Sequence, residues 1–371
     1  MVSLGDLMKN DFDILERFKF GLNLDDPWRY SGMNEPKSII IPHVMKIELK
    51  DSDTAGKIGE AIARAMGRRL TTKREEILAL VDAISNAEID FVRCWFPWNY
   101  FVEKVGDEYQ YPMDDMAKAL QEKGIALIPV IACGYSRMLP EGVSVDRDPS
   151  KYIEIAGEHA RELVKHYRSK VWQIENEPNW WEMHEAAGWR NGVAWLEGKF
   201  KYELLKMLND AVHEEDGNTL TLINLEADRE IASDEITMYS SLSDIIGLDF
   251  YPNYQEPEPV DPKVITKAED VAQKLGKNVV ISETGYPSGP SWLGYSYGKQ
   301  AEYVLRACMQ AFECKHVSAI SIWRYADTSW RSFPPQENHF GLYDEHLNSK
   351  PAYRVYADTI KQLKRDSQLS H

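Results

Sequence analysis

Apolar runs of strand length alternate with longer segments of helical periodicity along most of the chain. The runs are apolar throughout, which is typical of parallel strands that are buried on both faces. This pattern predicts eight strands, over residues 18–24, 90–96, 126–132, 171–176, 219–225, 245–250, 278–282 and 317–323. It predicts eight helices after the strands, over residues 73–86, 113–123, 151–167, 199–213, 232–240, 263–275, 299–312 and 352–364.

Eight successive β-α units predict an α/β fold of the closed (β/α)8, or TIM barrel, type. An open doubly wound sheet has the same alternation and remains the alternative architecture. No linker, repeat or low-complexity tract interrupts the pattern, so residues 1–371 are expected to form a single catalytic domain. The connection over residues 25–72 is much longer than an ordinary βα loop. We therefore expect a loop insertion or small subdomain there.

Charge and composition exclude several function classes. The 43 Lys and Arg residues against 59 Asp and Glu residues give a net charge of −16, which repels nucleic acid. No apolar run approaches the length of a membrane span, so no membrane partner is expected. Residues 1–20 lack the pattern of a signal peptide, and four cysteines without zinc-site spacing suit free thiols. These features favour a cytoplasmic protein, or a secreted one whose leader has been removed.

Two glutamates follow apolar strands at positions where a charge is costly unless it is used. Glu177 lies in the triplet Asn176-Glu177-Pro178 after the fourth predicted strand, and Glu283 follows the seventh. The carboxyl ends of all strands in such a barrel meet at one face, where active sites form. Two carboxyl groups that converge from nearly opposite strands are the arrangement that glycoside hydrolysis requires. The alternative is that each glutamate only caps a helix or pairs with a surface lysine.

With these motifs the sequence resembles the retaining glycosidases of glycoside hydrolase clan A, which share the (β/α)8 barrel. The resemblance covers almost the whole chain and implies that Glu177 is the acid/base and Glu283 the nucleophile. It also implies that Arg93, on the second strand, orients the nucleophile. Tyr251, after the sixth strand, would donate a hydrogen bond to the nucleophile. The ring of Trp323, after the eighth strand, would lie beneath the reacting sugar.

Families 5 and 17 of the clan are the most similar, and two positions depart from the family 5 pattern. Asp249 occupies the position two residues before Tyr251 where family 5 has a histidine, and Cys133 stands where a third-strand histidine is common. Asp249 is instead interpreted as a hydrogen-bond acceptor that binds substrate or supports the site. The family within the clan and the sugar preference stay open.

The two glutamates need different environments to play the two roles. We expect Arg93 and Tyr251 to hold Glu283 ionised, whereas burial and the nearby negative charge should raise the pKa of Glu177. Arg93 has an alternative partner in Glu175. Asn176 either binds the sugar 2-hydroxyl or serves as a structural amide in the turn.

Aromatic residues in the predicted loops at the carboxyl face provide a second indication of a sugar site, because sugar rings stack on flat side chains. Besides Trp323, we select Trp98, Trp180 and Trp292 as candidate binding residues. No dinucleotide-binding, phosphate-loop or nucleophile-elbow motif is present. Neither a cofactor nor a metal is expected.

The sequence thus predicts a retaining β-glycoside hydrolase that cleaves β-linked glycans or oligosaccharides of the glucan or mannan type by double displacement. Its partner is an oligosaccharide or polysaccharide substrate. Two alternatives use the same residues: a carbohydrate-binding barrel without turnover, and a transglycosylase. The oligomeric state and the choice between endo and exo action are not predicted.

Overall fold

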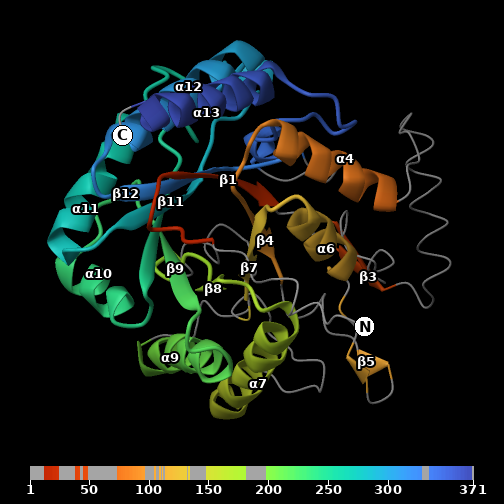
Figure 1. The fold of residues 1–371 in the computed structure, drawn as a ribbon, viewed down its shortest axis with the longest axis vertical. Helices are drawn as coiled ribbons and strands as arrows, with labels where there is room; N and C mark the ends of the chain where they lie inside the picture. Colours follow the sequence, from red (N-terminus) through yellow and green to blue (C-terminus); the bar gives the residue numbers. More distant parts are fainter. Residues whose placement is uncertain are drawn as a thin grey trace.

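Eight parallel strands close into a barrel, as Figure 1 shows. The computed structural model describes residues 12–24, 38–41, 45–48, 73–96, 104–105, 108–109, 111, 113–131, 133, 148–180, 198–327 and 334–369. The order around the barrel is β1-β12-β11-β10-β9-β8-β7-β4, and β1 pairs with both β12 and β4. The strands are β1 (Lys19–Leu24), β4 (Phe91–Trp95), β7 (Ala126–Val130), β8 (Val171–Glu175), β9 (Leu220–Glu226), β10 (Ile245–Phe250), β11 (Val279–Thr284) and β12 (Val317–Ile322).

Helices lie around the outside of the barrel (Figure 1). They are α4 (Lys73–Asn86), α6 (Asp114–Glu122), α7 (Pro149–Tyr167), α9 (Gly198–Glu215), α10 (Ser233–Ser240), α11 (Lys267–Leu275), α12 (Tyr297–Glu313) and α13 (Pro351–Leu369). All eight predicted strands and all eight predicted helices are confirmed, and closure of the sheet rules out the open doubly wound alternative. The helix predicted over 263–275 divides into a short 3-10 helix, η2 (Pro262–Thr266), and α11.

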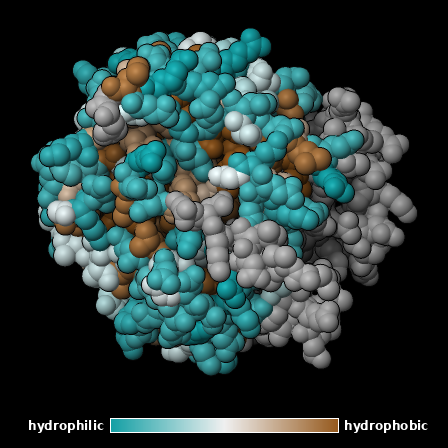
Figure 2. Space-filling view, in the orientation of Figure 1, coloured by the Kyte–Doolittle hydropathy of each residue, from teal (hydrophilic) through white to brown (hydrophobic). Residues whose placement is uncertain are grey.

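The long connection after β1 contains an antiparallel pair of strands, β2 (Ser38–Ile41) and β3 (Met45–Glu48). The remainder of the interval 25–72 lies outside the described residues, so the expected insertion stays a prediction. A second antiparallel pair, β5 (Lys104–Val105) and β6 (Glu108–Tyr109), follows β4. Among the described helices, none is both long enough and apolar enough to cross a membrane. Figure 2 shows a largely hydrophilic surface in this view.

The barrel interior changes from apolar to polar along the strands. Near the amino ends, a buried cluster contains Phe91, Ile128, Leu222 and Val280 together with Ile14, which precedes β1. Near the carboxyl ends, the same strands carry polar side chains that hydrogen-bond one another across the interior. This polar layer is the floor of the candidate site.

Two strands are irregular at the points where they present their glutamates. The pairing of β8 with β9 shifts between Gln173 and Glu175, and the pairing of β10 with β11 advances from Ile281 to Glu283. In a regular strand, successive side chains point to opposite faces. The irregularity in β11 lets Ser282 and Glu283 both reach partners in the interior, which is the way a β-bulge redirects a side chain.

Candidate active site

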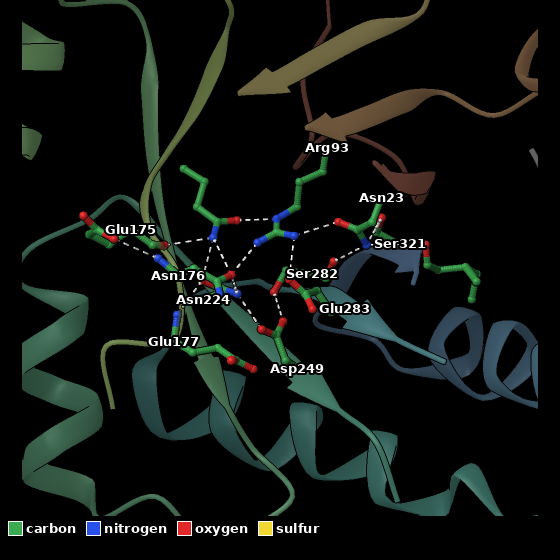
Figure 3. A network of polar contacts seen from close by, with 12 residues as sticks. Asn23, Arg93, Glu175, Asn176, Glu177, Asn224, Asp249, Ser282, Glu283 and Ser321 are labelled. Atoms are coloured by element: carbon green, nitrogen blue, oxygen red, sulfur yellow. Dashed lines mark hydrogen bonds and ion pairs between the residues drawn. The ribbon is translucent and has the colours of Figure 1, made fainter. Parts of the chain in front are cut away.

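Arg93 is the hub of the polar layer, as Figure 3 shows. Its guanidinium donates from Nε to Gln173 Oε1 (2.5 Å), from Nη1 to Asn23 Oδ1 (2.8 Å) and Glu283 Oε1 (2.6 Å), and from Nη2 to Asn176 Oδ1 (2.7 Å). The Arg93 side chain is only 2% exposed. The planar guanidinium is always charged and can donate to all of these acceptors at once, whereas the single ammonium group of a lysine could not.

The ion pair of Arg93 is with Glu283 and not with Glu175, the alternative that the sequence left open. Glu175 lies on the side of β8 away from Arg93 (Figure 3). Burial raises the pKa of the Cys133 thiol and of the Tyr152 hydroxyl, and the nearby charge of Glu175 raises both pKa values further.

Both carboxylate oxygens of Glu283 accept charge-assisted hydrogen bonds. Oε1 accepts from Arg93, and Oε2 accepts from the Tyr251 hydroxyl at 2.6 Å. Glu283 is buried, and a buried charge is tolerated when it is paired and hydrogen-bonded. The Tyr251 ring packs edge-on against Phe340, with 5.6 Å between the ring centroids. The carboxylate of Glu283 is therefore fixed in place from two sides.

Glu177 follows β8 in an unusual backbone conformation, with a positive φ of 42°. A left-handed conformation at a residue other than glycine costs on the order of 1 kcal/mol and tends to occur at functional sites. Asn224 supports it, because its Oδ1 accepts the Glu177 backbone N–H at 3.1 Å. Burial raises the pKa of the Glu177 carboxyl well above its usual range, and the charges of Glu283 and Glu226 raise it further.

Asp249, which lies on β10 beside Glu283, is fully buried. Ser282 Oγ donates to its Oδ1 at 2.6 Å, and Asn224 Nδ2 donates to its Oδ2 at 2.5 Å. Burial, followed by the charges of Glu283 and Glu177, raises the pKa of Asp249. Because both oxygens are held by protein donors, its position suits support of the site more than direct binding of substrate.

Five polar residues of the layer were not selected from the sequence, although each had a signal. Each interrupts an otherwise apolar strand near its carboxyl end, the same feature that drew attention to Arg93. These residues are Asn23, Gln173, Asn224, Ser282 and Ser321.

Asn224 connects the residues of β8 and the segment after it with Asp249 on β10. It accepts from Gln173 Nε2 (2.6 Å) and donates to Asn176 Oδ1 (2.8 Å), in addition to its bonds with Glu177 and Asp249. The neighbouring strand must carry glycine at Gly247. A Cβ atom there would lie 2.4 Å from Ser282 Oγ and 3.1 Å from Asn224 Cβ.

Three of the four selected tryptophans are described, and all three follow strands at the carboxyl face. Trp323, after β12, is half-buried, and its backbone N–H donates to Thr284 O at 2.8 Å. Trp180, after β8, is half-buried beside the Arg229 guanidinium, 5.3 Å from the ring centroid. Trp292, on the loop after β11, is 74% exposed. Trp98 lies outside the described residues.

Among the described residues, no group of three or more histidine, cysteine or acidic side chains is arranged so that it could hold a metal ion. The polar layer instead arranges one guanidinium, several amides and three carboxyl groups, those of Glu177, Asp249 and Glu283. Groups of these types can carry out acid/base and nucleophilic chemistry.

Comparison of the fold with solved structures gives confident matches to glycoside hydrolases, all at low sequence identity. No protein-family model matches the sequence, and no curated protein matches it. A GH5_18 protein from Streptomyces cattleya, in complex with Manβ1-4GlcNAc, has a TM-score of 0.64 at 15% identity, over 78% of this chain and 75% of that one. A GH5_18 protein from Bifidobacterium longum subsp. infantis has a TM-score of 0.64 at 16% identity, over 93% and 79%.

A third match belongs to a different glycosidase family. A GH2 β-galacturonidase from Eisenbergiella tayi, bound to galacturonate, has a TM-score of 0.58 at 17% identity; the alignment covers 93% of this chain but 51% of that one. Likeness at this level establishes the shared (β/α)8 fold. The chemistry has to be argued from the site itself.

Proposed function

We propose that this protein is a retaining β-glycoside hydrolase in which Glu283 is the nucleophile and Glu177 the acid/base. The observation that carries the proposal is the difference between the two carboxyl groups. Glu283 accepts from Arg93 and from Tyr251, which favours an ionised, fixed carboxylate. Glu177 has a raised pKa, which favours the protonated form. Two neighbouring acids whose environments differ in this way are the signature of an acid and a nucleophile.

The first step forms a covalent bond between Glu283 and the anomeric carbon of the sugar. Glu177 gives its proton to the glycosidic oxygen, and the bond between that oxygen and the anomeric carbon breaks. Esterification removes the negative charge of Glu283, which is one cause of the raised pKa of Glu177. The pKa of Glu177 therefore falls after this step, and Glu177 becomes able to act as a base.

In the second step, water attacks the anomeric carbon while Glu177 takes its proton. The ester bond breaks, and Glu283 returns to its ionised form against Arg93 and Tyr251. We infer that Asn176 binds the sugar hydroxyl next to the reacting carbon. Its amide oxygen is held by Arg93 and Asn224, which fixes the plane of the amide group.

The substrate that suits this site best is a neutral β-linked glycan of the glucan or mannan type. Apart from Glu175, which lies on the side of β8 away from Arg93, four carboxyl groups are buried at the described carboxyl ends of β8 to β11: those of Glu177, Glu226, Asp249 and Glu283. The Arg93 side chain among them is directed to protein acceptors. Neutral hydroxyl groups would find many hydrogen-bond partners among these groups, whereas Arg93, which is already bound to protein acceptors, would not pair with a sugar carboxylate.

Azide rescue of two variants tests the assignment of the two roles. With a 2,4-dinitrophenyl β-glycoside, Glu177→Ala still forms the glycosyl-enzyme, because this leaving group needs no acid. Azide then accelerates turnover, and the product is the β-glycosyl azide. Glu283→Ala is rescued to the α-glycosyl azide, because azide replaces the nucleophile. The exposed Glu256, on the loop after β10, provides a control, since Glu256→Ala should retain the wild-type rate.

Other outcomes would reject the proposal. The same azide anomer from both variants would contradict the assigned roles. If the wild type is active and neither variant is impaired, residues other than Glu177 and Glu283 would have to carry out the reaction. A wild type that binds oligosaccharides but hydrolyses none of the gluco and manno substrates would indicate a carbohydrate-binding barrel.

A further inference from the structure

The end of β9 and the loop after it contact both the segment that follows Glu177 and the backbone of Tyr251. On one side, the backbone of Glu226 pairs with the side chain of Asn179: Glu226 N–H donates to Asn179 Oδ1 (3.0 Å), and Asn179 Nδ2 donates to Glu226 O (2.9 Å). This binds the segment that follows Glu177 to the end of β9. On the other side, Asp228 Oδ2 accepts the backbone N–H of Tyr251 at 2.8 Å.

The contact of Asp228 falls where strand pairing stops. Ala227 N–H still donates to Asp249 O at 2.9 Å, as a continuation of the pairing between β9 and β10. The next backbone donor is the N–H of Tyr251, the first residue after β10, and it donates to the Asp228 side chain instead of a strand carbonyl. Tyr251 in turn donates its hydroxyl to Glu283. Asp228 is thus one residue removed from the proposed nucleophile.

We propose that Asp228 is a positioning residue, which holds the backbone of Tyr251 so that the Tyr251 hydroxyl stays on Glu283. The role in turnover rests on the proposed function above, whereas the effect on the position of Tyr251 does not. Asp228 is itself held, because its backbone N–H donates to Glu226 Oε1 at 2.9 Å and its carbonyl accepts from Lys267 Nζ at 3.4 Å.

Asp228 also gives the site a group that titrates near neutral pH. Burial raises its pKa to about 7, and the charge of Glu226 acts in the same direction. The Tyr251 N–H and the Lys267 charge, at the start of α11, act in the opposite direction. Tyr303 of α12 also faces this carboxyl, since the charge of Asp228 contributes to the raised pKa of Tyr303.

The ionised carboxylate accepts the Tyr251 N–H more strongly than the neutral acid. Turnover should therefore rise as pH increases through 7. This limb of the pH profile belongs to Asp228 and is lost when the residue cannot titrate.

The experiment compares Asp228→Ala with Asp228→Asn. Displacement of a catalytic group by about 1 Å costs up to roughly 100-fold in rate, so Asp228→Ala should lower kcat by about 10- to 100-fold with little change in KM. Asp228→Asn keeps an oxygen acceptor and should recover much of the rate, without the inflection near pH 7. In a Tyr251→Phe background, Asp228→Ala should have no further effect, because it acts through the lost hydroxyl.

Asp244 offers a matched control at the other end of β9. Its Oδ2 accepts the backbone N–H of Thr221 at 2.7 Å, so Asp244→Ala removes the same kind of contact far from the carboxyl face. We expect Asp244→Ala to lower the melting temperature while leaving kcat and the pH profile unchanged.

A crystal structure of Asp228→Ala gives a readout that needs no activity. The proposal expects Tyr251 to move and its 2.6 Å contact with Glu283 to be lost. Retention of that contact overturns the proposal, as does an additive loss of rate in the Tyr251→Phe background. A wild type without turnover would reject the proposed function, while the crystal structure would still decide the role of Asp228.

Discussion

Replacement of Arg93 by methionine probes the centre of the site most severely. Methionine has an unbranched side chain and no charge, so Arg93→Met keeps much of the packing and removes all four hydrogen bonds of the guanidinium. Glu283 is then left as a buried carboxylate with one donor fewer. Removal of one member of a buried ion pair costs about 3–5 kcal/mol. At about 1.3 °C per kcal/mol for a chain of this length, the melting temperature should fall by roughly 4–6 °C.

A double-mutant cycle shows whether this cost arises from the ion pair. Glu283→Gln removes the other charge, and the double variant leaves neither charge buried. We expect the double variant to lose less stability than the two single variants together, by about 1.5–3 kcal/mol. Urea unfolding at pH 7 measures all three. A surface pair provides the control: Lys123→Met removes the partner of Asp82 (3.3 Å, side chains 47% and 63% exposed) and should change stability by less than about 1 kcal/mol.

The same variant should also lose activity, because Glu283 is no longer held from the Arg93 side. A loss of up to about 100-fold in kcat is expected for a nucleophile free to move by an ångström. Two results would refute the reasoning: an Arg93→Met protein as stable as the wild type, or strictly additive losses in the cycle.

Three further predictions follow from the structure. Glu177→Gln should raise the melting temperature at pH 8 by about 1–3 °C: the pKa of Glu177 is raised in the folded state, so its contribution to stability is present below the ordinary glutamate pKa and is lost as pH rises. A gain independent of pH would contradict this. Gly247→Ala should lower the free energy of unfolding in urea by about 1–3 kcal/mol, because the new Cβ meets Ser282; an unchanged midpoint would disprove the clash. Trp292→Ala should reduce kcat/KM more for long oligosaccharides than for disaccharides, and equal losses would exclude a distant sugar subsite.

Most of the fold could be predicted because parallel strands covered by helices have a strong sequence pattern. The strand Ile245–Phe250 and the helix Lys73–Asn86 have the predicted bounds. The hydrophobic pattern does not distinguish a closed barrel from an open sheet, because the strands of both are buried in the same way. The division of residues 263–275 was not predicted. The amphipathic period continues through Pro262–Thr266, although that turn is a 3-10 helix.

The candidate site was predicted less completely, for two physical reasons. The shift in pairing before Glu283 depends on the neighbouring strand and leaves no mark in the pattern of β11. The amides of the polar layer are visible in the sequence as polar residues within apolar strands, since Asn224 interrupts its strand as Arg93 does. A lone amide carries less signal than a buried charge, because leaving it unpaired costs less.

The most direct test of the central claim is covalent trapping of the nucleophile. The protein is incubated with activated 2-deoxy-2-fluoro β-glucosyl and β-mannosyl substrates, and the intact mass and the peptide masses are then measured. The account predicts the mass of one fluorosugar on the peptide that contains Glu283, and no label in Glu283→Gln. A label on another residue would contradict the account. So would a wild type that hydrolyses the parent glycosides but forms no adduct, while a control retaining glycosidase is labelled.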